Sequence, residues 1–213
     1  MKLVLRLTFL FFTFASQLNA QNILANQKDE QRPAQVSKTK FGAKIGLNAS
    51  NTDFNRGYPT PLVPVVTTWQ PGIAIGFFLQ VPVNSVFSLQ QEYIFSQMNG
   101  KIKNSGTEYK LSYLSLPLVL KLNFLPRFAL LAGPQFDLLI HAQQLVNGNS
   151  LNITHDTEER SIGATAGLEY YVLKNISLTA RYVHGLNNIG IGQRSATTEF
   201  KYESVQITTE IKF

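Results

Sequence analysis

The sequence predicts an all-β protein, an eight-stranded antiparallel up-and-down transmembrane β-barrel that follows a cleaved signal peptide. Three observations support this: an apolar run near the amino terminus, segments in which apolar and polar side chains alternate, and connections that are alternately long and short. We expect residues 1–20 to be the signal peptide, residues 21–39 a flexible periplasmic tail, and residues 40–213 the barrel.

The amino terminus has the parts of a secretion signal. Lys2 and Arg6 supply positive charge, residues 7–15 form an apolar run too short to span a bilayer comfortably, and Ala20 precedes the expected cleavage point. Residues 21–38 are polar, which is typical of a flexible tail. No later stretch approaches the roughly 18 apolar residues of a membrane helix.

Composition narrows the functional classes. The chain has no cysteine, which excludes disulfides, thiolate metal ligands and a lipid-carrying cysteine after the signal. Its formal net charge is +6, but the basic residues are spread along the chain and form no cluster. We therefore predict no nucleic-acid partner.

The first four predicted strands show a period of two. Residues 40–49 place apolar side chains at odd positions, and residues 70–81 and 86–97 alternate in the same way around a tight turn at 82–85. Residues 109–122 carry leucine at every even position from 114 onward. Pro117 lies on the polar face of this strand, where its missing N–H predicts a bulge or local distortion.

The last four predicted strands continue the pattern. They are residues 128–140, 160–172, 176–184 and 203–213. In the final strand, odd positions from Val205 to Phe213 are mostly apolar and even positions from Ser204 to Lys212 are polar. A strand ending on an aromatic residue resembles the terminal strand that the barrel-assembly machinery reads, so we expect Phe213 to be an assembly signal.

The connections alternate in length. The long ones are residues 50–69, 98–108, 141–159 and 186–201, and the short ones are 82–85, 123–127 and 173–175. In the first long connection, Pro59, Pro61 and Pro64 argue against a strand. In bacterial barrels short turns face the periplasm and long loops face outside, so we expect both termini in the periplasm.

Aromatic residues are expected at the two membrane interfaces. Those predicted near the long loops are Trp69, Phe95, Tyr109, Tyr113, Tyr182 and Tyr202, and those near the short turns are Phe41, Phe87, Phe128, Tyr170 and Phe213.

A soluble lipocalin-like barrel is the rival fold. It would need a charged exterior, but only 15% of the residues are charged and the polar strand faces are mostly Gly, Ser, Thr, Gln and Asn. Small polar side chains suit a narrow filled lumen better than a solvated surface.

Charged residues on the predicted inward faces form a balanced set. Inside a barrel they would be shielded from water, so we expect them to pair in a lumenal charge network. The basic members are Lys44, Lys121, Arg181 and Lys212, and the acidic members are Glu92, Asp137, Glu169 and Glu210.

Four segments resemble a known family. They are YLSLPLVLK (residues 113–121), KIGLN (44–48), SLQQEY (88–93) and AGPQ (132–135). Over about residues 40–213 the chain resembles the PorT-like outer-membrane β-barrels of the Bacteroidota. The resemblance implies an eight-stranded barrel of the OmpA/OmpX type in the outer membrane. Namesake members assist a cell-envelope secretion pathway, whereas most relatives share only the fold.

Catalytic chemistry has little support in the sequence. His184 with Ser195, or His155 with Ser161, could form a dyad, but nothing in their spacing singles them out, and His141 also lies beside a long connection. An acidic, solvated loop explains the group at residues 155–159 better than a metal site does. We therefore expect no enzyme, no catalytic residue, no cofactor and no metal.

The leading hypothesis is a non-enzymatic envelope or secretion-associated scaffold or binding protein with a filled lumen. Its expected partners are outer-membrane lipid, the barrel-assembly machinery and an unknown envelope protein. A lipid-modifying outer-membrane enzyme and a small-solute porin are the alternatives.

Overall fold

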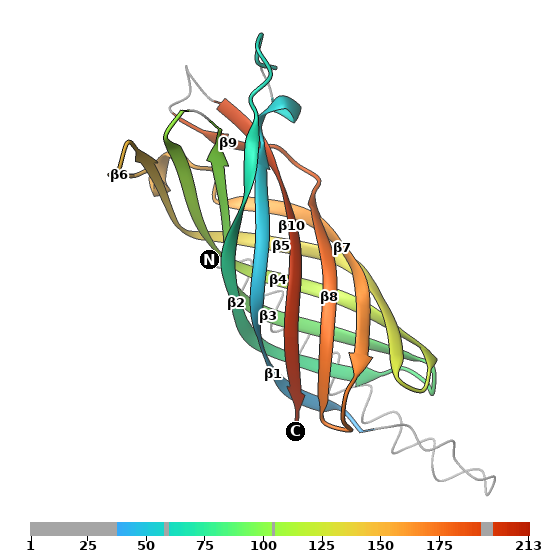
Figure 1. The fold of residues 1–213 in the computed structure, drawn as a ribbon. Coiled ribbons are helices and arrows are strands. Elements are labelled where there is room, and N and C mark those ends of the chain that lie inside the picture. Colours follow the sequence, from blue (N-terminus) through green and yellow to red (C-terminus); the bar gives the residue numbers. More distant parts are fainter. Residues whose placement is uncertain (1–37, 58–59, 104, 193–197) are drawn as a thin grey trace, which may run out of the picture. The chain divides into compact units, whose positions relative to one another are not determined.

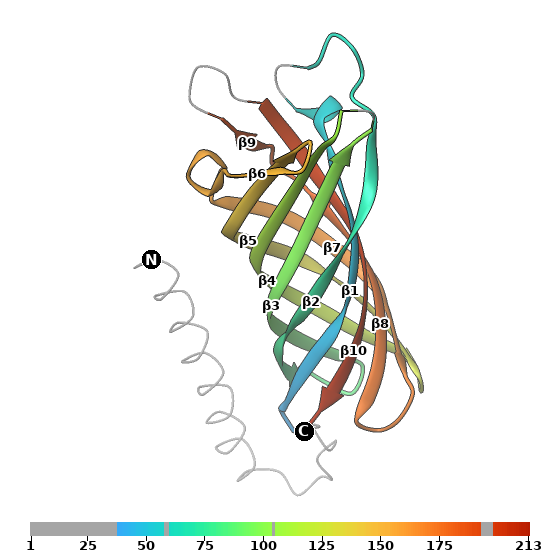
Figure 2. The same ribbon diagram turned by 60° about the vertical axis from the view of Figure 1, so that its left-hand side comes forward.

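The computed structural model describes residues 38–57, 60–103, 105–192 and 198–213. The predicted signal peptide and residues 21–37 of the predicted tail lie outside the described residues. In the described part the chain forms a closed antiparallel β-barrel, seen from two sides in Figures 1 and 2. None of the helices described there has the length and hydropathy needed to cross a membrane.

Eight long strands build the barrel wall within the described residues. They are β1 (Lys40–Asp53), β2 (Thr67–Pro82), β3 (Phe87–Ile102), β4 (Thr107–Leu125), β5 (Phe128–Val146), β7 (Arg160–Tyr171), β8 (Ile176–Gly185) and β10 (Thr198–Lys212). Two short strands, β6 (Asn149–Asn152) and β9 (Ile189–Ile191), pair with β5 and β10. The 3-10 helices are η1 (Phe54–Arg56) and η2 (Thr154–Asp156).

Pairing of the first and last strands closes the barrel. β1 and β10 run antiparallel from the pair Gly42–Lys212 to the pair Asp53–Lys201. Closure leaves no unpaired sheet edge, which membrane-spanning strands require because lipid cannot satisfy backbone groups. The predicted fold class is confirmed.

The two ends of the barrel differ, and we name them by their connections. The turn end carries the short connections after β2, β4 and β7, together with the carboxyl terminus (Figure 1). The loop end carries the long connections after β1, β5 and β8.

Over the turn-end half, the strands expose their apolar face and bury their polar face. On β10, the outward side chains of Val205 and Ile207 are 42% and 53% exposed, whereas Gln206 and Glu210 are buried. A soluble barrel requires the opposite arrangement, so this half is built for lipid. The inward and outward faces predicted for these strands are confirmed.

The strands extend further toward the loop end than predicted. β1 continues to Asp53, β5 continues to Val146 and forms a hairpin with β6, and β10 begins at Thr198 and pairs with β9. The predicted loops 141–159 and 186–201 are therefore partly strand, and the predicted loop 98–108 shortens to residues 103–106 between β3 and β4. The predicted connection 50–69 is strand at both ends, in β1 and β2, but residues 60–66 between them contain no strand, as Pro61 and Pro64 predicted.

There is a physical reason why the sequence pattern did not predict these strand extensions. Beyond the apolar belt the strand faces exchange character. On β4, Tyr109 and Leu111 point inward and are buried, while Lys110 and Ser112 alternate with them on the outer face. The apolar alternation used to define the strands stops where this polarity switch occurs, although backbone pairing continues.

The prediction of an aromatic belt near the long loops is partly wrong. Trp69 and Tyr182 are 45% and 40% exposed, but Tyr109, Tyr113 and Tyr202 are buried. The latter three lie on inward-facing positions beyond the polarity switch and pack in the barrel interior. At the turn end, Phe41 and other predicted aromatics remain exposed.

Pro117 produces a local gap rather than a bulge. β4 keeps the same register with β3 on both sides of it, from Gln91–Leu118 to Ile94–Ser115, but the ladder omits the two residue pairs between. Because proline has no N–H to donate, this interruption is the expected distortion without an inserted residue.

Candidate functional site

Inside the turn-end half, charged side chains join in one chain of ion pairs. Its order is Arg181, Glu92, Lys44, Glu210, Lys121, Glu169 and Lys212, and we call it the turn-end network. Each carboxylate bridges two cations, one on each oxygen. Every member is at most 5% exposed.

The series of ion pairs begins on β8. Arg181 Nη1 lies 2.8 Å from Glu92 Oε2, and Lys44 Nζ lies 2.8 Å from Glu92 Oε1. Lys44 also approaches Glu210 at 2.8 Å. β8 and β3 are not neighbours in the sheet, so the Arg181–Glu92 pair crosses the lumen.

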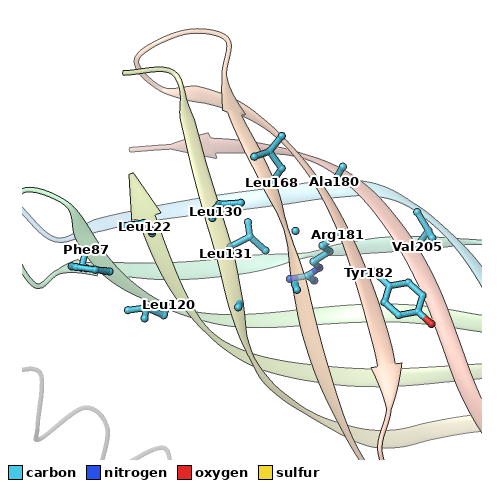
Figure 3. Close-up of a pocket in the computed structure, with 13 residues that line it drawn as sticks. Phe87, Leu120, Leu122, Leu130, Leu131, Leu168, Ala180, Arg181, Tyr182 and Val205 are labelled. Atoms are coloured by element: carbon cyan, nitrogen blue, oxygen red, sulfur yellow. The ribbon is translucent and has the colours of Figure 1, made fainter. Parts of the chain in front are cut away.

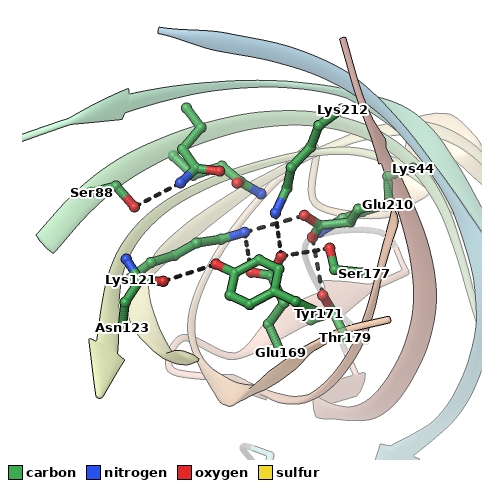
Figure 4. A network of polar contacts seen from close by, with 12 residues as sticks. Lys44, Ser88, Lys121, Asn123, Glu169, Tyr171, Ser177, Thr179, Glu210 and Lys212 are labelled. Atoms are coloured by element: carbon green, nitrogen blue, oxygen red, sulfur yellow. Dashed lines mark hydrogen bonds and ion pairs between the residues drawn. The ribbon is translucent and has the colours of Figure 1, made fainter. Parts of the chain in front are cut away.

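Figure 4 shows the other part of the network. Lys121 lies 3.2 Å from Glu210 and contacts Glu169, while Lys212 lies 2.6 Å from Glu169. Lys212 also sits 4.3 Å from the centre of the Tyr171 ring, where a cation–π contact adds to the ion pair.

Hydroxyl and amide groups donate further hydrogen bonds to the carboxylates of the network. Ser177 donates to Glu169 at 2.6 Å, Thr179 donates to Glu210 at 3.1 Å, and the Gln90 amide donates to Glu92 at 2.8 Å. Buried carboxylates with several donors are less costly than bare ones. The small polar residues of the inward faces thus support the network.

Asp137 is the member of the predicted set that stands apart. It accepts hydrogen bonds from the Tyr202 hydroxyl and from the Gln135 amide, the latter at 2.9 Å. Among the described residues it has no ion pair within 4.0 Å. Strand parity placed it inside correctly, but its level along the barrel puts it beside tyrosine rather than lysine.

Glycine allows close packing of the strands beside the largest member of the network. Gly167 on β7 pairs with Arg181 on β8. A Cβ added at Gly167 would lie 2.6 Å from the Cβ of Arg181, closer than real side chains approach. The nearest atom is the Ala180 carbonyl oxygen at 2.3 Å, so glycine permits the close approach of β7 to β8 beside Arg181.

The loop-end half of the lumen is filled by apolar side chains instead. We call this group the loop-end cluster; its buried members are Phe54, Met98, Tyr109, Leu111, Tyr113, Ala142, Ile153, Val183, Ile189, Phe200 and Tyr202. Phe54 packs on the rings of Tyr109 and Phe200, with centroids 5.4 and 5.5 Å apart. The cluster is a small hydrophobic core inside the barrel.

Connections as well as strands supply this cluster. Phe54 comes from η1 after β1, Ile153 precedes η2, and Ile189 begins β9. Asp53 caps η1 by accepting from the Asn55 N–H at 3.0 Å, and Arg56 holds it to β10 through Glu203 at 3.0 Å. The alternation pattern did not predict these residues, because they lie in connections and not in the expected strands.

Of the two combinations weighed for catalysis, His184 with Ser195 lies partly outside the described residues, and among the described residues no hydrogen bond joins His155 to Ser161. The Ser161 hydroxyl is buried and donates to Asn187 at 3.1 Å, and Ser195 lies outside the described residues. His184 faces Glu203 at 3.7 Å, and His141 contacts the Thr154 hydroxyl at 3.3 Å. In the part of the chain described, no group of three or more His, Cys, Asp or Glu side chains could hold a metal ion.

Phe213, the predicted assembly signal, lies at the turn end. Its N–H donates to the Phe41 carbonyl at 2.8 Å, and the two rings stack 6.3 Å apart. The ring is 76% exposed. It therefore extends the exposed apolar belt of β1 and β10.

The outer face of the barrel carries a shallow apolar depression, shown in Figure 3. Ala132, Ala166 and Ala180 are small, and larger side chains such as Leu130 and Leu168 rise around them. The depression lies in the exposed apolar belt, where lipid chains fill such hollows.

The fold and the inverted faces define a class, the integral β-barrels of the outer membrane. The chain belongs to the outer membrane protein beta-barrel domain family, which matches residues 19–190. The protein is therefore an outer-membrane β-barrel protein. A comparison with curated protein sequences gave no significant match.

Three solved structures are reported as similar to this chain. Neisserial surface protein A (NspA) is 13% identical with a TM-score of 0.50, over 83% of this chain and 98% of that one. Ail, the attachment invasion locus protein of Yersinia pestis, is 13% identical with a TM-score of 0.47, over 83% and 100%. OprG from Pseudomonas aeruginosa is 10% identical with a TM-score of 0.44, over 84% and 98%. At such identities the likeness concerns the fold alone.

Proposed function

We propose that this protein is a non-enzymatic outer-membrane barrel with a sealed lumen that acts as a binding or scaffold protein through its loop end. The observation that carries the proposal is the double filling of the lumen by the turn-end network and the loop-end cluster. A lumen filled at two levels leaves the loops as the surface available for function, which disfavours the porin alternative.

The proposed orientation places the loop end outside the cell and both termini in the periplasm, after removal of residues 1–20 as a signal peptide. The long connections after β1, β5 and β8 at one end of the barrel, opposite the short turns at the other, support it. The motifs at residues 113–121 and 132–135 support a place among the PorT-like barrels, and with it a role near envelope secretion.

The absence of an enzymatic role is part of the proposal. A hydrolase needs a nucleophile and a base held within hydrogen-bond reach at an open site. The buried Ser161 hydroxyl is turned toward Asn187, and the His141 ring contacts a threonine. Both arrangements are structural contacts of the loop end.

Orientation and function can be tested in intact cells. Because the sequence has no cysteine, a thiol reagent can label only the introduced residue in the single variants Ser150→Cys at the loop end and Ser85→Cys at the turn end. A membrane-impermeant maleimide should label Ser150→Cys on intact cells and Ser85→Cys only after lysis. A heterobifunctional crosslinker on Ser150→Cys, with a spacer arm long enough to reach across the loop end, should then capture an envelope protein.

Two outcomes would contradict the proposal. Labelling of Ser85→Cys on intact cells would reverse the orientation. A lipid A mass spectrum that changes when the protein is deleted, and recovers with the wild type, would favour the enzyme alternative.

A further inference from the structure

The connection between β1 and β2 carries an unusually exposed apolar tip. Leu62 is 103% exposed, Val63 is 75% exposed and Val66 is 58% exposed. Pro61 and Pro64 flank the first two and limit the freedom of the backbone. We call residues 61–64 the apolar tip.

The tip does not belong to the lipid-facing belt. It lies beyond the polarity switch, where outward side chains such as Asn51 and Asp53 on β1 are polar. In Figures 1 and 2 this connection projects from the loop end, away from the end that carries the carboxyl terminus. Exposure to the protein's own membrane therefore does not account for its apolar character.

Hydrogen bonds and packing hold the base of the connection in place, so the position of the apolar tip is defined. The Asn55 amide donates to the Val65 carbonyl and accepts from the Val65 N–H, both at 2.8 Å. The Lys103 N–H donates to the Val66 carbonyl at 2.8 Å, and the Val65 side chain packs on the loop-end cluster. A preorganised segment loses less conformational entropy on binding.

Close packing holds the other side of the base. Gly57 follows η1, and a Cβ added there would lie 1.9 Å from the Glu199 carbonyl oxygen on β10. Only glycine permits this approach between the connection and the strand.

The chemistry of the tip points to a protein partner. Residues 57–69 include no charged side chain. Leu, Val and Pro side chains have no hydrogen-bonding group, so the tip is unsuited to sugars or nucleic acids. Partly exposed charges lie on elements that flank its base: the Arg56 side chain in η1 is 53% exposed and the Lys101 side chain on β3 is 42% exposed. An apolar centre with polar groups at its edge is the usual anatomy of a protein interface.

We propose that the apolar tip is the docking element of this protein, and that Leu62 and Val63 enter an apolar pocket on a different envelope or cell-surface protein. This inference rests on the proposed function and specifies which part of the loop end makes the contact.

The test places a photocrosslinking amino acid at Leu62 or at Leu151 in the full-length protein, in cells. Leu151 on β6 is a matched control because it is an apolar loop-end residue, 60% exposed. The position-62 variant should give a discrete adduct with one other protein, and the position-151 variant should not. Heat-modifiable gel mobility verifies that both barrels are folded.

The protein identified in the adduct is then purified and its affinity for the barrel measured. The double variant Leu62→Asp/Val63→Asp should weaken binding by about tenfold or more, whereas Leu151→Asp should leave it unchanged. Equal weakening by both would overturn the assignment to the tip.

Other results separate this inference from the proposed function. A protein adduct from position 151 alone would overturn the inference and keep the loop-end binding role. Adducts only with lipid, or only with a second copy of this chain, would also overturn the inference. No adduct from either position in folded barrels would contradict both.

Discussion

The same eight strands build both halves of this barrel, but the two halves place apolar and polar side chains on opposite faces. In the turn-end half, apolar side chains face lipid and charged side chains fill the lumen; Ile207 is 53% exposed beside the buried Gln206. In the loop-end half, polar side chains face outward and apolar side chains such as Phe200 fill the lumen. In each half, the side chains inside the barrel are opposite in polarity to those on its outer face.

Stability should also differ between the halves. The turn-end network joins strands across the barrel, so breaking it affects the whole wall. The loop-end cluster holds connections onto the strands, so breaking it should release those connections first.

The largest effect is expected for Glu92→Gln. This change leaves Arg181 buried without the carboxylate that pairs with it, which should lower the free energy of unfolding by about 3–5 kcal/mol. Urea unfolding in lipid vesicles measures it. The double variant Glu92→Gln/Arg181→Met should recover a large part of the loss, and failure to recover would argue against an ion-pair origin.

Leu116→Arg tests the position of the polarity switch. Leu116 lies on the outer face of β4 among leucines, where a cation facing lipid costs about 2–4 kcal/mol. Ser112 lies on the same face beyond the switch, so Ser112→Arg should cost at most about 1 kcal/mol. If the two variants had similar free energies of unfolding, the polarity switch would not lie between Ser112 and Leu116.

Phe54→Ala should act locally. Phe→Ala in a rigid core typically costs 3–5 kcal/mol, but a connection can relax, so we expect about 2 kcal/mol. Hydrogen exchange over residues 54–57 and 60–66 should accelerate while that of β3 and β4 is unchanged. The exposed Leu151 provides the control Leu151→Ala, for which no acceleration is expected.

Glu108→Gln should have the smallest effect. Its carboxylate pairs with Lys101 at 2.5 Å, but the side chains are 32% and 42% exposed. Partly exposed pairs contribute at most about 1 kcal/mol and weaken in salt. Because the same substitution is made at Glu92, a loss as large as that of Glu92→Gln would contradict the distinction between buried and exposed pairs.

The two halves also differ in how well the sequence predicts them. The network residues lie on strands, where a period of two fixes which side chains share a face, so Lys44 and Glu210 could be placed inside from the sequence. Which cation meets which carboxylate depends on how far each strand is staggered around the barrel, and the alternation pattern contains no information on that stagger.

The loop-end cluster was not predicted, in part because some of its members come from connections without periodicity. Phe54, Ile153 and Ile189 each lie in a connection between immediate neighbours that are polar or glycine. Tyr109 and Tyr202 had the correct inward parity but were assigned to an interfacial belt. A useful sequence signal would have been the exchange of apolar character between odd and even positions along one strand, visible in β4 and β10.

The central claim is that the lumen is closed at two levels, and single-channel recording of the purified protein in planar bilayers tests it most directly. We predict no sustained conductance for the wild type, and none for Phe54→Ala because the turn-end network still closes the path. Stable wild-type openings whose ion selectivity changes with Glu92→Gln would show a conducting lumen and contradict the account.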